Sequence, residues 1–299
     1  MQIIEHVEIG MLILIHLQNM HQSSLELNKG IVLTGCKGDR GRKAYTTILD
    51  QNLIEPLLEK PRAQFQNVNG NEILGTPESP AKMQALHSSS ALGVNIFQYW
   101  QKRGLLDEIA AACGFCKKGI KFTTEIVFEE KYPIRSKFIV PPNIDVVFRN
   151  NQRSQYKGFA VECKFSEAYS PSEHDGLKGK YLEEAELWND LPAVKELAAE
   201  INPIDKRYQY LHAAQLIKHI LGLKEVHGKS GFKLMYLWYD VVGKAGAIHR
   251  QEIEDFSNIV KEDDVRFHSM SYQELIVLLA RDYRDEHGEY IQYITDRYL

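Results

Sequence analysis

The 299-residue sequence has no apolar run long enough to cross a membrane. Its longest apolar stretch, MLILIHL at 11–17, is much shorter than the roughly 20 residues that a bilayer requires. The first ten residues contain no Lys or Arg and therefore lack the basic start of a secretory signal. We expect no membrane partner and a cytoplasmic location, where the four cysteines would be reduced.

Several motifs that mark other functions are also missing. The eleven histidines form no H-E-x-x-H pattern, and the G-K-S at 228–230 lacks the earlier glycine of a phosphate-binding loop. No second C-x-x-C accompanies Cys113 and Cys116, so a structural role for this pair is favoured over a redox or zinc role. No fixed-period repeat is present. Zinc proteases, nucleotide hydrolases and repeat proteins are therefore disfavoured.

The composition is that of a globular protein, with 44% hydrophobic and 25% charged residues. The net charge of −4 excludes a uniformly basic surface but allows a local basic face. We predict an N-terminal region over 1–84, assigned to target recognition by its position and its basic cluster. The main domain is predicted over 85–299, with a charged insertion at 170–206. The basic cluster consists of Lys37, Arg40, Arg42 and Lys43.

Hydrophobic periodicity predicts an α/β protein. A helix starts at Ser88 to Ser90, which can cap it, and ends at Gly104. Alternation then predicts three strands, the first within 121–130 and the other two joined by a polar turn within 143–165. A long helix over 205–222 and an apolar strand within 231–242 follow, before one or two C-terminal helices. The order is helix, three strands, helix, strand.

Two predicted strands carry charged residues where apolar ones are expected. Asp145 interrupts an apolar run, and Glu162 and Lys164 lie on one face of their strand, ~7 Å apart at the base. Pairing of the two strands would bring Asp145 beside Glu162. Carboxylates this close favour a bound cation, and Mg²⁺ takes one or two carboxylates and completes its shell with water and phosphate. We therefore predict a Mg²⁺ site, which Mn²⁺ could also occupy, formed by Asp145, Glu162 and the backbone carbonyl of Cys163. The alternative is a solvated sheet face with a cross-strand ion pair.

These residues resemble a known family. Asp145 followed by Glu162-Cys163-Lys164 is similar to the active-site signature of the PD-(D/E)XK nuclease superfamily, the fold of many type II restriction endonucleases. The resemblance covers residues 88–245 and implies a helix, a three-stranded antiparallel meander, a helix and a further strand in a mixed sheet flanked by helices. It also implies that Asp145 and Glu162 bind Mg²⁺ and that Lys164 assists the attacking water. Ile144 stands where the family has Pro.

The resemblance implies one further acid from an earlier strand, and Glu125 is the candidate by position. A second E-x-K, at 129–131, lacks a preceding strand with a central Asp, and Tyr132-Pro133 ends its strand at once. We therefore assign no function to it. Arg207, Gln209 and His212, on the predicted long helix, could face the site, although a solvated surface is the favoured position for them.

The sequence therefore predicts a Mg²⁺-dependent endonuclease that hydrolyses DNA. A double-strand cut favours two active sites and hence a homodimer. The alternatives are an RNA or branched-DNA nuclease of the same fold and a nucleic-acid-binding or scaffold protein without catalysis. Basic residues that could contact the DNA backbone, besides the 37–43 cluster, are Lys117, Lys118, Lys121, Arg135 and Lys137.

Overall fold

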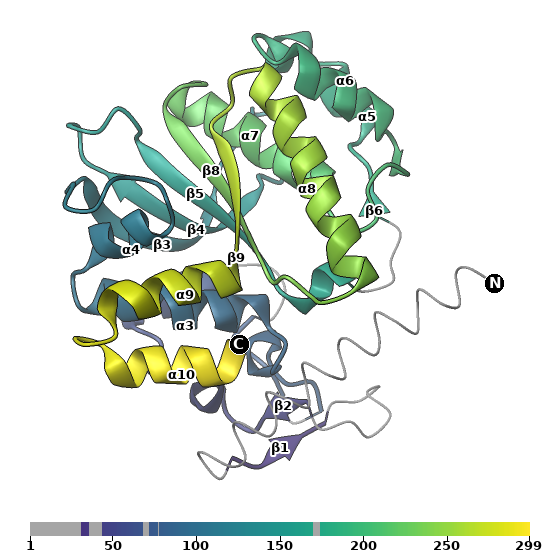
Figure 1. Cartoon of the computed structure of the whole chain (residues 1–299). Coiled ribbons are helices and arrows are strands. Elements are labelled where there is room, and N and C mark those ends of the chain that lie inside the picture. The colour runs from purple at the N-terminus through teal and green to yellow at the C-terminus, as the bar shows by residue number, and fades with distance from the viewer. Residues whose placement is uncertain (1–30, 36–43, 68–71, 77, 170–173) are drawn as a thin grey trace.

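The computed structural model describes residues 31–35, 44–67, 72–76, 78–169 and 174–299, and a five-stranded sheet forms its centre (Figure 1). The strands are β3 (Thr123–Lys131), β4 (Asn143–Asn150), β5 (Gly158–Lys164), β8 (Phe232–Trp238) and β9 (Phe267–Ser271), in the spatial order β3-β4-β5-β8-β9. β3, β4 and β5 are antiparallel neighbours, whereas β5, β8 and β9 run parallel. The predicted α/β architecture with a mixed central sheet is confirmed.

Helices cover both faces of this sheet (Figure 1). One face packs against α3 (Ser89–Lys102), α4 (Leu106–Ala112), α9 (Tyr272–Tyr283) and α10 (Gly288–Tyr298). The other packs against α6 (Pro192–Glu200), α7 (Ala213–His227) and α8 (Lys244–Glu262). None of the helices in the described residues is long and apolar enough to span a membrane.

Shorter elements connect these layers. The helices are α2 (Glu59–Gln66) and α5 (Gly179–Leu182), and the single 3-10 turns are η1 (Leu49–Asn52), η2 (Lys82–Gln84), η3 (Ser166–Tyr169) and η4 (Ala185–Trp188). The two-residue strands are β1 (Leu33–Thr34), β2 (Tyr45–Thr46), β6 (His174–Asp175) and β7 (Ile204–Asp205). β6 pairs with β7 within the predicted 170–206 insertion.

β5 lies at the centre of the sheet, and all seven of its residues are buried. Phe159, Val161 and Cys163 join the apolar cluster on the α3 side, whereas Ala160 joins the cluster on the α7 side. Because side chains alternate along a strand, Glu162 and Lys164 face α7. Two charged residues are thus held under a helix, in a strand that packs on both faces.

α3 forms where its sequence predicts it. The Ser88 hydroxyl accepts a hydrogen bond from the Ala91 N–H at 3.1 Å, which caps the helix, and Gly104 follows the helix with φ +69°. Two buried amides on α3 hold an earlier segment of the chain. Asn95 Oδ1 accepts from the Ile54 N–H at 2.8 Å, and Gln98 Oε1 accepts from the Leu58 N–H at 2.9 Å.

The described part of the predicted N-terminal region packs onto the sheet. Leu53, Leu57, Phe65 and Met83 belong to the same apolar cluster as α3 and β3, and Phe65 lies against Phe128 with ring centroids 5.6 Å apart. The basic cluster that the sequence predicts at 37–43 lies outside the described residues. A role of region 1–84 in target recognition stays a prediction.

α7 differs from its predicted bounds of 205–222. Before it, the N–H groups of Gln209, Tyr210 and Leu211 donate to the carboxylate of Glu252 on α8, so they are satisfied without a helix. The predicted stop, Gly222, lies inside α7, and the helix ends instead before Gly228, which has φ +72°.

Candidate active site

Three acidic residues follow one another across the antiparallel part of the sheet. Val146 on β4 pairs with Phe128 on β3 and with Val161 on β5. The next residues along these strands are Glu129, Asp145 and Glu162, which we call the acid row. The row lies at the end of the ladder between β4 and β5, since the last pair in that direction is Val146 with Val161.

The strands separate at the acid row because the Asp145 side chain takes the place of a backbone acceptor. Its Oδ2 accepts a hydrogen bond from the Cys163 N–H at 2.6 Å. The N–H and C=O of one strand residue point to the same neighbouring strand. The Cys163 carbonyl therefore points to the Asp145 side of β5, as the sequence prediction requires of a third ligand.

Glu162 lies beneath α7 and is fully buried. Its Oε1 lies 2.7 Å from Lys164 Nζ, and its Oε2 lies 2.7 Å from His219 Nε2. Lys164 Nζ also donates to Gln215 Oε1 at 2.9 Å. Burial alone would raise the pKa of Glu162, but Lys164 and His219 outweigh it and hold this pKa at about 2. Glu162 is therefore ionised at neutral pH.

One face of α7 contacts Glu162 and Lys164. His212, Gln215 and His219 are three and four residues apart, a spacing that places side chains on the same side of a helix. Gln215 and His219 contact the E-x-K residues, whereas His212 lies beside them. The sequence singles out His212 with Arg207 and Gln209. Arg207 instead pairs with Asp255 at 2.9 Å, so only part of that set faces the site.

Glu129 is a member of the acid row that the sequence motif does not identify. It has φ +53°, a conformation that costs a residue with a side chain about 1–3 kcal/mol and that occurs most often at functional sites. Burial and the charges of Glu72 and Glu162 raise its pKa to about 7. Glu72 itself accepts from Ser90 Oγ at 3.0 Å, beside the start of α3.

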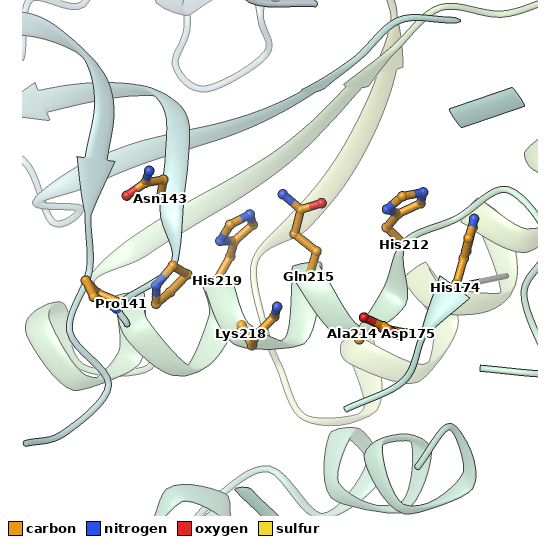
Figure 2. A pocket seen from close by; sticks show the side chains of 10 residues that line it. Pro141, Asn143, His174, Asp175, His212, Ala214, Gln215, Lys218 and His219 are labelled. Atoms are coloured by element: carbon orange, nitrogen blue, oxygen red, sulfur yellow. The ribbon is translucent and has the colours of Figure 1, made fainter. Parts of the chain in front are cut away.

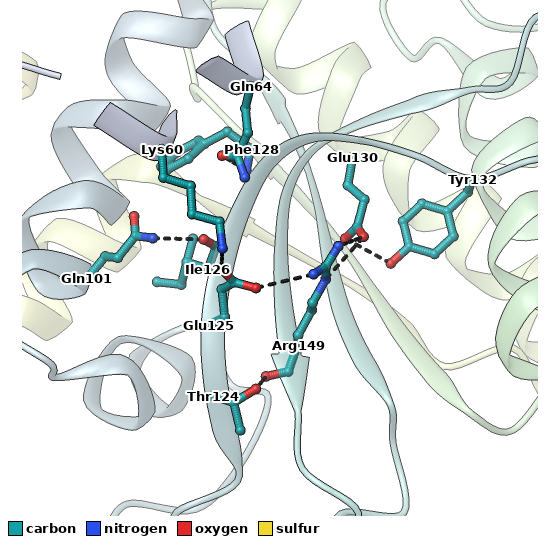
Figure 3. Close-up of polar contacts among 10 residues, drawn as sticks. All are labelled: Lys60, Gln64, Gln101, Thr124, Glu125, Ile126, Phe128, Glu130, Tyr132 and Arg149. Carbon is teal, nitrogen blue, oxygen red and sulfur yellow. Dashed lines mark hydrogen bonds and ion pairs between the residues drawn. The ribbon is translucent and has the colours of Figure 1, made fainter. Parts of the chain in front are cut away.

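The structure does not place Glu125, the sequence candidate for the additional acid, in the acid row. Its carboxylate pairs with Lys60 on α2 and, at 3.2 Å, with Arg149 Nη1 on β4 (Figure 3). Glu125 precedes Glu129 by four residues on β3, which is ~13 Å along a strand. Glu129 therefore occupies the position at the site for which the sequence proposed Glu125.

Comparison with protein-family models adds an independent finding. Residues 18–299 match the model of a family described as "Restriction Endonuclease associating with ARP". The chain belongs to this family. Comparisons with the curated proteins and with the solved structures found no match. Membership of a restriction-endonuclease family indicates a nuclease-like function.

The acid row of this family member has the donors that a hard divalent cation needs. Asp145, Glu162 and the Cys163 carbonyl offer oxygen atoms, and Glu162 Oε1, although 2.7 Å from Lys164 Nζ, has a second lone pair for a cation. Within the described residues, no three His, Cys, Asp or Glu side chains are arranged to hold a metal. Two carboxylates with a carbonyl are nevertheless a set that suits Mg²⁺, since water and phosphate usually complete its shell.

The protonation states fit a site that binds a cation. Burial and the charges of Glu162 and Glu129 raise the pKa of Asp145 well above its ordinary value, against the effect of Lys164 and of the Cys163 N–H. For Lys164, burial is outweighed by Glu162 and Asp145, which raise its pKa. A cation bound at Asp145 would counter the charges that raise this pKa, whereas the raised pKa of Lys164 keeps its ammonium charged.

The predicted DNA-contacting lysines and arginines have mixed positions. Arg135 pairs with Glu186 at 2.6 Å and Lys137 pairs with Glu184, so both lie against the 170–206 insertion. Lys118 Nζ lies 5.0 Å from the ring centroid of Tyr283.

Cys113 is fully buried and free, and burial raises the pKa of its thiol. This favours the structural role predicted for the C-x-x-C pair.

Proposed function

We propose that this chain is a Mg²⁺-dependent endonuclease of the PD-(D/E)XK type that hydrolyses phosphodiester bonds of DNA. The observation that carries the proposal is the acid row beside Lys164, with Asp145 bonded to the Cys163 N–H at 2.6 Å and Glu162 paired to Lys164 at 2.7 Å. A solvated sheet face does not explain this arrangement, because Glu162 is fully buried and Lys164 is nearly so.

Each residue has a defined role in this proposal. Asp145, Glu162 and the Cys163 carbonyl would hold the cation, which supplies a Lewis acid beside the phosphorus when bound. Lys164 stays protonated, and Glu162 and Gln215 take two of its three N–H donors, so the third would donate to the attacking water or to a phosphate oxygen. Glu129, with its pKa of about 7, can accept the proton that this water loses.

His219 acts through Glu162 and is a positioning residue. Its Nε2 lies 2.7 Å from Glu162 Oε2, which leaves Oε1 directed toward Lys164. Gln215 positions Lys164 in the same way, because its Oε1 accepts a hydrogen bond from Lys164 Nζ. These two contacts fix the E-x-K side chains from α7, in the manner of outer-shell partners at metal sites.

A cleavage screen tests the proposal. Plasmid, linear double-stranded, single-stranded and branched DNA, and RNA, are incubated with the protein and Mg²⁺ or Mn²⁺, beside Lys164→Ala and Asp145→Ala. We expect cutting of DNA by the wild type and none by either variant, with the fold of both retained by circular dichroism. Full activity in either variant would refute the assignment.

The screen also separates the alternatives. Cutting of RNA or branched DNA alone would identify another nuclease of this fold. If the protein cuts none of these substrates and neither cation changes its melting temperature, it would instead be a nucleic-acid-binding or scaffold protein. The cytoplasmic location and the homodimer stay predictions.

A further inference from the structure

A cavity of about 490 Å³ lies beside the acid row on the α7 side of the sheet (Figure 2). Figure 2 shows the side chains of Gln215 and His219 on α7 and of His212 just before it, with His174 of β6 next to His212. The lining residues come from the segment before β4, from the 170–206 insertion and from α7: Pro141, Pro142, Asn143, His174, Asp175, His212, Ala214, Gln215, Lys218 and His219.

The cavity adjoins the candidate active site through two residues. Gln215 lines the cavity and accepts from Lys164, and His219 lines it and contacts Glu162. A molecule in the cavity would therefore lie next to whatever lies at the E-x-K residues.

Three histidines in this cavity have ring nitrogens without a hydrogen-bond partner. His219 is 1% exposed, and its Nδ1 is unpaired. His174 is 7% exposed, and beyond its hydrogen bond with the Leu211 backbone it has an unpaired ring nitrogen. The Nε2 of His212 is also unpaired, and the rings of His174 and His212 lie 4.0 Å apart between centroids. Buried polar groups almost always have partners, so these nitrogens point to a bound group.

The charge around the cavity favours an anion. Lys218 adds an ammonium to the lining, and burial, the first cause, lowers its pKa despite the opposing effect of Glu162. Burial, together with the charge of Lys164, lowers the pKa of His212 to about 3, so this ring is neutral. A neutral imidazole has one N–H donor and one acceptor nitrogen, so His174 and His212 can each offer one donor, and the lining has one acid, Asp175, which is exposed. Within the described residues, no metal-holding cluster is formed here.

We propose that the cavity lined by His174, His212 and Lys218 binds a phosphate group of the DNA strand, next to the phosphodiester at the acid row. The inference rests on the proposed function, because it takes the ligand to be the same strand. The imidazole N–H groups and the Lys218 ammonium donate to the phosphate oxygens.

Binding measurements without divalent cations test this proposal apart from catalysis. The affinity of the full chain for a DNA duplex is measured in EDTA over a range of salt concentrations. Lys218→Met keeps the length of the side chain and removes its charge, so we expect weaker binding and a salt slope smaller by about 1. His174→Phe keeps a ring and removes its nitrogens, so we expect weaker binding with an unchanged slope.

The control is Lys195→Met, which removes an exposed lysine of α6 and should change neither affinity nor slope. A second arm neutralises the phosphates of one strand one at a time with methylphosphonates. We expect one position at which the wild type loses affinity and Lys218→Met loses none. Unfolding curves confirm that each variant is folded.

Other outcomes overturn the proposal. Unchanged DNA affinity in Lys218→Met and His174→Phe would show that the cavity does not contact the strand, as would absence of binding by the wild type. Binding of inorganic phosphate alone that requires Lys218, without an effect on DNA, would identify a free-anion site. Binding of Zn²⁺ that is lost in His174→Phe would identify a metal site. None of these readouts uses cleavage, so unchanged affinity in the two variants overturns this inference alone, whereas the cleavage screen tests the nuclease proposal on which it rests.

Discussion

At the scale of single residues, Asp145 and Glu129 decide the geometry of the site. Alternation along β5 is enough to predict that Glu162 and Lys164 share a face, and the strand turn predicts Asp145 beside them. The choice between Glu125 and Glu129 could not be made in this way, because both lie on β3 and their register against β4 depends on the connection over 132–142. The positive φ of Glu129 has no signal in the sequence.

The variant Glu129→Gln tests whether Glu129, rather than Glu125, is the additional acid of the site. We expect Glu129→Gln to lower the cleavage rate ~10²–10⁴-fold, the range for a positioned side chain that accepts a proton in the reaction. Glu125→Gln removes an exposed ion pair on the same strand and should leave the rate near that of the wild type. The measurement is the initial rate of DNA cleavage. Equal losses of cleavage rate in both variants, or a loss in Glu125→Gln alone, would contradict the assignment of Glu129 in place of Glu125.

Glu129 also predicts a pH dependence of stability. Its pKa is raised from 4.5 to about 7, so the native state keeps a proton that the unfolded chain has released over this interval. The contribution of Glu129 to the free energy of unfolding without metal therefore falls as the pH rises from 4.5 through 7. Glu129→Gln lacks this effect. We expect it to melt at a higher temperature than the wild type at pH 8 and to lose this advantage near pH 4.5, in calorimetry with EDTA. A difference in melting temperature that does not depend on pH would contradict the raised pKa of Glu129.

At the scale of elements, α7 carries the contacts that fix the site. Helical periodicity predicts that a helix exists here but misplaces its start, because the acid that satisfies the backbone over 209–211 comes from Glu252, more than forty positions later. It also misplaces the end at Gly222. This glycine is needed for packing, since a Cβ there would meet the Tyr132 carbonyl oxygen at 2.7 Å. Such long-range contacts cannot be inferred from local pattern.

Gly222→Ala tests this packing. The added methyl group must displace α7 or the segment at Tyr132, so we expect a loss of ~1–3 kcal/mol in the free energy of unfolding, as for other overpacked sites. The matched control is Gly288→Ala at the start of α10, where a Cβ meets nothing within 4 Å. We expect no loss there. Urea unfolding measures both. An unchanged stability in Gly222→Ala would show that α7 does not lie as closely on Tyr132 as described.

At the scale of the whole molecule, the apolar cluster on the α3 side joins segments that the sequence divides between two regions. Leu53, Phe65 and Met83 lie in one cluster with α3, β3 and the C-terminal helices. The polar, Gly-containing composition that suggests a boundary near residue 84 is therefore compatible with continuous packing across it. The family match from 18 to 299 also spans this position.

Phe65→Ala tests how the chain unfolds. Phe65 is 2% exposed and packs on Phe128 of β3, so we expect a loss of ~3–5 kcal/mol. If the cluster is one cooperative unit, the single unfolding transition of the whole chain shifts, including the fluorescence of Trp238 on β8. Two transitions, with that of Trp238 unchanged, would indicate an independent N-terminal domain.

The central claim is that the acid row holds a divalent cation. Anomalous diffraction from crystals containing Mn²⁺ tests it most directly. We expect a peak within ~2.3 Å of Asp145, Glu162 and the Cys163 carbonyl oxygen, at the distances of hard-cation oxygen ligands. The peak should be lost in Asp145→Asn. Mn²⁺ bound only elsewhere, or an acid row that stays free of metal at saturating Mn²⁺, would contradict the account.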